Sequence, residues 1–259
     1  MISKELISAI NASIEAGKQI MKIYLTADFG IEYKKDDSPL TIADKQAHQI
    51  IMKHLLATQI PVLSEEGRYI AYDERKKWDV FWLVDPLDGT KEFIKKNDEF
   101  TVNIALIKHN TPIAGVVYVP ATNCLYYADK QGAFVVENIQ PDANIEKQSV
   151  KLPFNTKRSE FVVVGSRSHM SNETEDFIAR MDHQGKPLKI VSKGSSLKIC
   201  MVAEGNADCY PRLGPTMEWD TAAGHAIALF AGKTVVEYPS MNALKYNKEN
   251  LLNPYFIVN

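Results

Sequence analysis

The apolar residues of this chain recur with two spacings, one typical of helices and one typical of strands. Spacings of three and four predict a helix over residues 3–24, with Leu6, Ile10 and Ile14 on one face. A second helix is predicted over residues 41–58, because Thr41 and Asp44 have the spacing of a capping box. Shorter apolar or alternating runs predict strands at residues 60–63, 80–84, 100–107, 113–119, 125–128 and 132–137.

The rest of the chain alternates strands with helices. Strands are predicted at residues 161–165, 188–192, 206–211, 234–238 and 254–258, and helices at 172–181, 194–204 and 219–231. This alternation is typical of a mixed α/β layer. Residues 138–155 contain two prolines and little periodicity, which indicates part strand and part connection. We therefore expect one domain with two lobes, residues 1–155 and 156–259.

Two carboxylates follow the second predicted strand. Asp85 and Asp88 lie three residues apart, and Pro86 between them has a fixed φ and no N–H, which predicts a tight turn. Two carboxylates this close repel each other unless a cation or a proton lies between them, and hard oxygen ligands suit Mg²⁺ or Mn²⁺. The N–H groups of Gly89 and Thr90 could hold a phosphate oxygen at a helix start. A surface turn with an Asx cap is the alternative interpretation of this stretch alone.

Two other motifs with similar residues do not fit. A calcium-binding EF-hand loop needs acids at alternate positions and a glutamate six residues after its glycine, where this chain has Lys95. Haloacid-dehalogenase-type phosphatases place one residue between their two acids, and this chain places two. Further acids stand at other element ends: Glu65 and Glu66 follow the first strand, and Asp220 opens a helix of small residues.

Composition limits the kind of partner. The chain has 259 residues, 45% of them hydrophobic, which is enough for a proper core, and its net charge of −2 argues against long nucleic acid. No apolar run reaches membrane-spanning length, and the charged start does not resemble a signal peptide. We expect Cys124, Cys200 and Cys209 to be buried thiols in a reducing, cytoplasmic setting. Peripheral attachment at the inner face of the cell membrane and the choice between monomer and homodimer stay open.

Three groups of these residues carry a resemblance to a known family. In order and spacing they resemble the signatures of the inositol monophosphatase superfamily of metal-dependent, lithium-sensitive phosphatases: Glu65-Glu66, Asp85-Pro-Leu-Asp88-Gly-Thr90 and Trp219-Asp220-x-Ala-Ala-Gly224. The resemblance spans nearly the whole chain. It implies an α/β (α+β) fold, a layered α/β/α/β/α sandwich with the active site between its two sheets.

The resemblance also implies metal ligands. Glu65, Asp85 and the backbone carbonyl of Leu87 are expected to bind one metal. A second metal, next to the leaving oxygen, is expected on Asp85, Asp88 and Asp220, and a third is held more weakly near Glu65. The expected cofactor is Mg²⁺, two to three ions per active site, with Mn²⁺ as a substitute and Li⁺ and Ca²⁺ as inhibitors.

Three further residues receive roles from the same resemblance. Thr90 and Asp44 are expected to form a hydrogen-bonded pair that orients the attacking water, although the spacing of Asp44 from Thr41 alone indicates only a helix cap. Glu66 is expected to act as an acid behind the metal ligands or to assist at the weak metal site.

The residues that flank the motifs narrow the substrate. They resemble the nucleotidase branch of the superfamily, which removes the 3′-phosphate of adenosine 3′,5′-bisphosphate (PAP), a by-product of sulfate-donor chemistry, to give AMP. A substrate with two phosphates and a purine also needs cations away from the metals. The expected substrate contacts are Glu65, Leu87, Asp88, Gly89, Thr90, Arg167, His169, Gly194, Ser195, Ser196, Lys198, Arg212 and Asp220.

Other functions stay open at this point. An inositol monophosphatase or a sugar bisphosphatase would use the same metal chemistry on another substrate. A catalytically silent regulator that binds nucleotide or metal is the alternative from a different class. Activity toward PAPS, the sulfated analogue of PAP, is not decided by the sequence.

Overall fold

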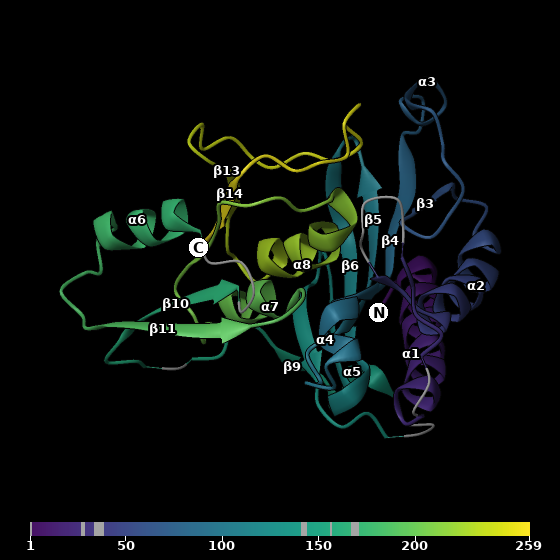
Figure 1. Ribbon diagram of the computed structural model, residues 1–259, viewed down its shortest axis with the longest axis horizontal. Helices are drawn as coiled ribbons and strands as arrows, with labels where there is room; N and C mark the ends of the chain where they lie inside the picture. Colours follow the sequence, from purple (N-terminus) through teal and green to yellow (C-terminus); the bar gives the residue numbers. More distant parts are fainter. Residues whose placement is uncertain (1, 27–28, 34–38, 141–143, 156, 167–170) are drawn as a thin grey trace.

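The computed structural model describes residues 2–26, 29–33, 39–140, 144–155, 157–166 and 171–259. Five layers lie beside one another in it (Figure 1). The outermost layer on one side holds two helices, α1 (Lys4–Tyr24) and α2 (Ile42–Leu56). Ser3 caps α1, and Thr41 with Asp44 forms the capping box predicted for α2. The two helices predicted over residues 3–24 and 41–58 are thus confirmed.

The second layer is a seven-stranded sheet in the order β3-β4-β5-β6-β7-β8-β9. Strands β3 and β4 are parallel, and every other neighbouring pair is antiparallel. The strands are β3 (Val62–Ser64), β4 (Val80–Asp88), β5 (Thr101–Lys108), β6 (Thr111–Val119), β7 (Cys124–Asp129), β8 (Gly132–Val136) and β9 (Val150–Lys151). Short elements connect them: β1 (Glu32–Tyr33), β2 (Pro39–Leu40), α3 (Tyr72–Arg75), α4 (Thr90–Ile94), the 3₁₀ helix η1 (Pro120–Thr122) and α5 (Ile145–Gln148).

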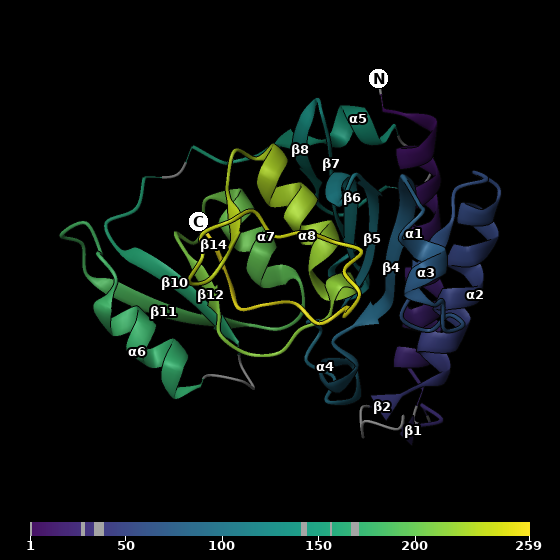
Figure 2. The same cartoon turned by 90° about the horizontal axis from the view of Figure 1, so that it is seen from above.

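The remaining three layers come from the second half of the chain. Helices α7 (Leu197–Glu204) and α8 (Glu218–Phe230) lie between the two sheets, and α6 (Asn172–Arg180) covers the far side (Figures 1 and 2). The second sheet joins a parallel pair, β10 (Phe161–Ser166) and β11 (Leu188–Lys193), to an antiparallel trio, β12 (Tyr210–Arg212), β14 (Phe256–Val258) and β13 (Val235–Glu237). A bridge between Val163 and Cys209 links the two parts. The layered sandwich is therefore confirmed.

Alternation along the strands of the first sheet divides the core into two. One set of apolar side chains faces α1 and α2, with Val102 and Ile104 of β5 among them. The opposite set, with Ala105 of the same strand, packs against α7, α8 and the second sheet. This inner core includes residues from both predicted lobes. The division of the chain at residues 155 and 156 stays a prediction.

Helix α8 lies unusually close to the first sheet at Gly115 of β6. A Cβ atom at this position would lie 2.7 Å from the backbone oxygen of Ala223 and 2.7 Å from the Cβ of Ala226. Only a glycine opposite a helix face of small residues allows this approach. The contact fixes the height of α8 above the sheet, and with it the position of Asp220 in the first turn of α8.

Two further expectations concern membrane-spanning segments and the state of the cysteines. In the part of the chain that the structure describes, no helix combines the length and the apolar character needed to cross a membrane. Cys124, Cys200 and Cys209 are all unpaired and buried, as predicted. Burial raises the pKa of each thiol, which keeps all three in the unreactive protonated form.

Candidate active site

Strand β4 does not end where the sequence suggested. It continues through Pro86 to Asp88, and its pairing with β5 shifts register between Asp85 and Asp88. The predicted tight turn is therefore wrong, and a β-bulge takes its place. Pro86 fits the bulge because residues there need no ladder hydrogen bond. Gly89 follows with a φ of 90°, a conformation that favours glycine, and α4 begins at Thr90.

Four acidic residues from three segments gather at this end of β4. Asp85 is only 2% exposed, and burial, with the charges of Glu65, Asp88 and Asp220, raises its pKa well above the usual range. Burial and the charges of Asp88 and Glu65 raise the pKa of Asp220 in the same way. Such mutual shifts require close acids. The structure thus brings together the four carboxylates that the sequence singled out.

Protein hydrogen bonds occupy oxygens of several of these carboxylates. The N–H of Leu87 donates to Oδ1 of Asp85 at 3.0 Å, and the N–H of Met217 donates to Oδ2 of Asp220 at 2.8 Å. Among the residues that the structure describes, no three His, Cys, Asp or Glu side chains are arranged so that they could hold one metal ion. The acids are neighbours, but their oxygens do not converge on one point.

The chemistry of this donor set nevertheless fits a divalent cation. Several buried carboxylates cost free energy when they ionise together, and a hard cation among them removes much of that cost. Carboxylate and carbonyl oxygens are the ligands that Mg²⁺ prefers. The available donors are the carboxylates of Glu65, Asp85, Asp88 and Asp220 and the carbonyl of Leu87.

The predicted pair of Thr90 and Asp44 lies beside these acids. The hydroxyl of Thr90 donates to Oδ1 of Asp44 at 3.2 Å and also lies 3.3 Å from the carbonyl oxygen of Leu87. The N–H and hydroxyl of Thr41 donate to the other oxygen, Oδ2, at 2.7 and 2.5 Å. Asp44 is therefore both a helix cap and a partner of Thr90, so the two interpretations of the sequence hold together.

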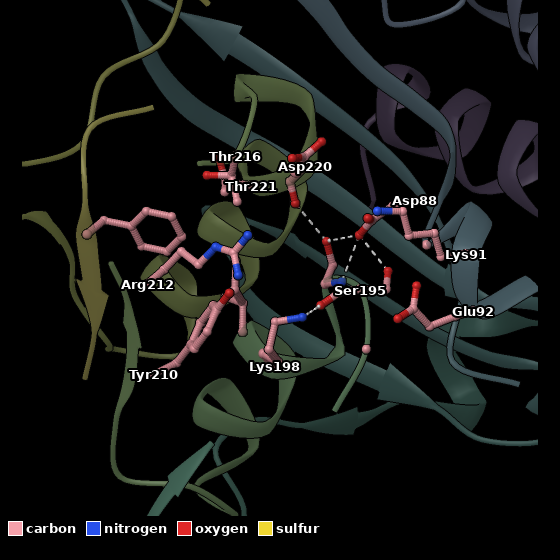
Figure 3. A pocket seen from close by; sticks show the side chains of 15 residues that line it. Asp88, Lys91, Glu92, Ser195, Lys198, Tyr210, Arg212, Thr216, Asp220 and Thr221 are labelled. Carbon is pink, nitrogen blue, oxygen red and sulfur yellow. Dashed lines mark hydrogen bonds between the residues drawn. The ribbon is translucent and has the colours of Figure 1, made fainter. Parts of the chain in front are cut away.

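The loop before α7 packs directly on Asp88 (Figure 3). Oδ2 of Asp88 accepts hydrogen bonds from the hydroxyl of Ser195 at 2.5 Å and from the N–H and hydroxyl of Ser196 at 2.8 and 3.2 Å. The N–H of Gly194 donates to Glu99 at 2.8 Å. Donors that the sequence assigned to substrate are thus bonded to protein carboxylates here, and their contact with substrate stays a prediction.

A cavity of about 180 Å³ opens between this loop and the second sheet. Asp88 and Asp220 line one side, and Lys198, Tyr210 and Arg212 line the other (Figure 3). Lys198 is 7% exposed and donates to the carbonyl of Ser195 at 2.6 Å. Burial lowers its pKa to about 8, against the opposing effect of the acids. The wall is therefore cationic and faces the carboxylates.

Arg212 has one donor without a hydrogen-bond partner. Its Nη2 donates to the carbonyl oxygen of Pro215 at 2.7 Å, whereas its buried Nε has no hydrogen-bond partner. A buried N–H without an acceptor is costly, so a ligand oxygen that reaches it gains a charge-assisted hydrogen bond. The lining thus favours an anionic ligand between two cationic side chains.

Not every predicted contact is described, and several neighbours were missed. Arg167 and His169 lie outside the described residues. Four residues that touch the site or its loop were not predicted as site residues: Glu99, Thr101, Asn103 and Tyr210. Alternation along β5 places Thr101 and Asn103 on its inner, otherwise apolar face, and that conflict is the signal that could have found them.

The sequence profile of the inositol monophosphatase family matches residues 2–253. CysQ of Salmonella typhimurium (strain LT2), named a 3′(2′),5′-bisphosphate nucleotidase, is 46% identical over 248 residues, which cover 94% of each chain. The protein of the same name from Escherichia coli (strain K12) is 45% identical over 247 residues, again 94% of each chain.

Solved structures agree with these matches. The crystal structure of CysQ from Bacteroides thetaiotaomicron, described as a bacterial member of the inositol monophosphatase family, has a TM-score of 0.90 and 48% identity. It covers 98% of this chain, and 96% of its own chain is matched. The extragenic suppressor protein SuhB of Bartonella henselae has a TM-score of 0.76 at 23% identity, over 99% of this chain and 94% of its own, and shows the shared fold alone.

Proposed function

The chain belongs to the inositol monophosphatase family, and we propose that it is a 3′(2′),5′-bisphosphate nucleotidase that hydrolyses the 3′-phosphate of PAP to AMP and phosphate. The family consists of metal-dependent phosphatases that generally use Mg²⁺. The observation that carries the proposal is the cavity with two opposite walls, acids on one side and Lys198 and Arg212 on the other. A substrate with two separate phosphates needs such a pair of walls.

The acidic wall would hold the cofactor. Glu65, Asp85, Asp88, Asp220 and the carbonyl of Leu87 are the ligands we assign, for two to three Mg²⁺ ions. When bound, the ions supply charge neutralisation for the phosphoryl oxygens and the leaving oxygen. Mn²⁺ is expected to substitute for Mg²⁺, and Li⁺ and Ca²⁺ are expected to inhibit. Glu66, which follows Glu65 in the sequence, is assigned as an acid behind the metal ligands or as an assistant at the weakest of the ion sites.

Thr90 and Asp44 would hold the attacking water. Asp44 accepts two hydrogen bonds from Thr41 on Oδ2, and its Oδ1 accepts a hydrogen bond from the Thr90 hydroxyl. With that proton engaged, the lone pairs of the Thr90 hydroxyl oxygen are left to accept a hydrogen bond from water. A water held in this way is aligned for attack on phosphorus.

The reaction follows from these positions. The water oxygen forms a bond to the phosphorus of the 3′-phosphate while the bond from phosphorus to O3′ breaks. The proton that the water loses passes to solvent, O3′ takes up a proton from solvent, and AMP and inorganic phosphate are released. No carboxylate of the chain bonds to phosphorus, so a single displacement with inversion is expected.

The cationic wall would hold the second phosphate. Lys198 and Arg212 both line the cavity, and the buried Nε of Arg212 has no hydrogen-bond partner. A 5′-phosphate between them would be bound away from the reacting phosphorus. Inositol 1-phosphate has no second phosphate to place there. PAP should therefore be preferred over inositol 1-phosphate.

A phosphate-release assay over a small substrate panel tests the proposal. With Mg²⁺, PAP should be hydrolysed much faster than inositol 1-phosphate or fructose 1,6-bisphosphate, and AMP rather than 3′-AMP should be the product. The same preparation of Asp85→Asn serves as the control for contaminating phosphatases. A faster rate with inositol 1-phosphate would contradict the nucleotidase assignment, and PAP binding without turnover would indicate a regulator.

The setting of the protein is part of the proposal. We assign the protein to the cytoplasm, and three buried, unpaired cysteines support this assignment. Its proposed partner is a small-molecule nucleotide substrate. Whether it is a monomer or a homodimer can be measured by sedimentation. Hydrolysis of PAPS can be measured in the same panel as PAP.

A further inference from the structure

Strand β5 carries two polar side chains on a face that is otherwise apolar. Thr101 and Asn103 are both 0% exposed, and they point to the inner face, where Ala105 joins the core between the sheets. Buried polar groups cost free energy unless their hydrogen bonds are made. The hydrogen-bond partners of Thr101 and Asn103 therefore explain why polar residues stand at these two buried positions.

The register of the sheet sets these residues opposite the acids. Thr101 is the cross-strand partner of Asp88, and Asn103 is the partner of Asp85, on the two sides of the bulge. The hydroxyl of Thr101 lies 2.5 Å from Oγ of Ser195 and 2.9 Å from Oδ1 of Asn103, and its single proton is shared between the two. Both contacts lead on to Asp88.

The contacts end on one oxygen. Ser195 donates to Oδ2 of Asp88 at 2.5 Å, and Nδ2 of Asn103 donates to the same oxygen at 3.3 Å. Nδ2 of Asn103 also donates to Oγ of Ser196 at 2.9 Å, which in turn lies 2.8 Å from the backbone oxygen of Asp220. None of the hydrogen bonds described for the Asp88 side chain uses Oδ1.

We infer that Thr101 and Asn103 are positioning residues for divalent-cation binding: Asn103 holds Oδ2 of Asp88 directly, Thr101 supports that hold through Ser195 and Asn103, and Oδ1 of Asp88 is left for the cation. They do not touch the cation or the substrate themselves. The inference rests on the proposed function, because it takes Asp88 as a metal ligand. Groups behind a ligand that fix its orientation change metal affinity by about 10–100-fold when removed.

Direct Mn²⁺ binding to the full chain tests the inference without substrate. Electron paramagnetic resonance of free Mn²⁺ measures the affinity of the wild type, Thr101→Val and Thr101→Ser. Valine has the shape of threonine without its hydroxyl, so we expect affinity to fall by about 10–100-fold. Serine keeps the hydroxyl and should restore most of the affinity. Thr174→Val, at another buried threonine on the outer helix α6, is the matched control and should bind as the wild type does.

The outcomes separate this inference from the proposed function. Wild-type affinity in Thr101→Val overturns the inference and leaves the nucleotidase proposal standing. A wild type that binds no Mn²⁺ overturns both the metal site and the inference. Should Thr101→Val fail to fold by circular dichroism, Asn103→Leu is measured in its place, with the same loss expected. If neither variant folds, the two residues have a structural role and the inference is wrong.

Discussion

The hydroxyl of Thr90 and the carboxylate of Asp44 meet at 3.2 Å although 46 residues separate them in the sequence. Asp44 belongs to the first turn of α2, whereas Thr90 begins α4 after the bulge in β4. Two helix starts, one in the outer helical layer and one in a connection of the first sheet, thus meet at one hydrogen bond. In the proposed mechanism the two residues orient the attacking water together, so they should behave as a unit.

Thr90→Val and Asp44→Asn should each lower kcat by about 10²–10⁴-fold, since each removes the alignment of the water. The double variant should be little worse than either single one, because the second change finds nothing left to remove. Thr90→Ser, which keeps the hydroxyl, is the control. Steady-state kinetics on PAP measures all four, and multiplicative losses in the double variant would show that the two residues act independently.

Asp85→Asn should stabilise the metal-free protein while it inactivates the enzyme. The pKa of Asp85 is raised, so its ionised form destabilises the native state, and the stability of the metal-free wild type falls as pH rises above the unfolded pKa of about 4. The neutral amide removes that penalty. In chelator, each kcal/mol gained in the free energy of unfolding should raise Tm by about 2–4 °C. Calorimetry with and without Mg²⁺ measures this.

The response to Mg²⁺ provides the check on that result. Mg²⁺ should raise the Tm of the wild type, because a ligand that binds the native state stabilises it, and should raise that of Asp85→Asn much less. Asp176→Asn, an exposed acid on α6, should leave both measurements unchanged. A lower Tm for Asp85→Asn in chelator would contradict the picture of mutually repelling acids.

Lys198 should give KM a dependence on pH. Its pKa of about 8 means that it is mostly charged at pH 7 and loses its proton as pH rises through 8. If it holds a phosphate, KM for PAP should increase above pH 8. Lys198→Met should raise KM about 10-fold or more at pH 7, with a smaller effect on kcat, and should abolish the pH dependence. Lys189→Met, an exposed lysine on β11, is the control. An unchanged KM would remove Lys198 from the substrate site.

His225 should make the protein less stable in acid. It is 4% exposed on α8, its Nδ1 lies 2.9 Å from the hydroxyl of Tyr246, and burial lowers its pKa to about 4. Below the unfolded pKa of about 6.5 the unfolded chain binds a proton that the native protein does not. Stability therefore falls as pH drops from 6.5 to 4, by at most about 3 kcal/mol from this residue.

Replacement of His225 isolates that contribution. His225→Gln keeps a hydrogen-bonding group for Tyr246 but cannot titrate, so the difference in denaturation free energy between pH 6.5 and 4.5 should shrink. His54→Gln, at a partly exposed histidine paired with Glu15, is the comparison and should change this difference less. Urea denaturation at the two pH values measures this difference. An equal difference in His225→Gln and the wild type would contradict the role given to His225.

The sequence predicts individual helices and strands because these depend on local pattern, whereas the layered sandwich and the metal-ligand roles of the acids follow from the resemblance to the inositol monophosphatase superfamily. Helix α1 and strand β6 follow from periodicity, and the capping box at Thr41 follows from spacing alone. Asp85 and Asp88 could be recognised because a strand, a proline and two acids stand together. The bulge could not, because Pro86 stops a ladder in either a turn or a bulge. The antiparallel partner β5, which decides between them, is set by the sheet as a whole.

The neighbours of the acids escaped for a different reason. Asn103 and Ser196 form one network with Asp88, yet 93 residues separate the first two. A polar residue on an apolar strand face shows that a partner exists, but not which one. Glu99 likewise reaches Gly194 across the interface between the first sheet and the loop before α7. Only the packing of the two halves reveals these contacts.

The place of β14 in the second sheet has a consequence for biosynthesis. It lies between β12 and β13, although both precede it in the sequence. A chain emerging from the ribosome therefore carries Glu65, Asp85, Asp88 and Asp220 before the sheet that supports Arg212 can close around residues 256–258. Arg212 cannot take its final place in the cationic wall until β14 pairs with β12, so the acids of the site are all synthesised before this cation is fixed beside them.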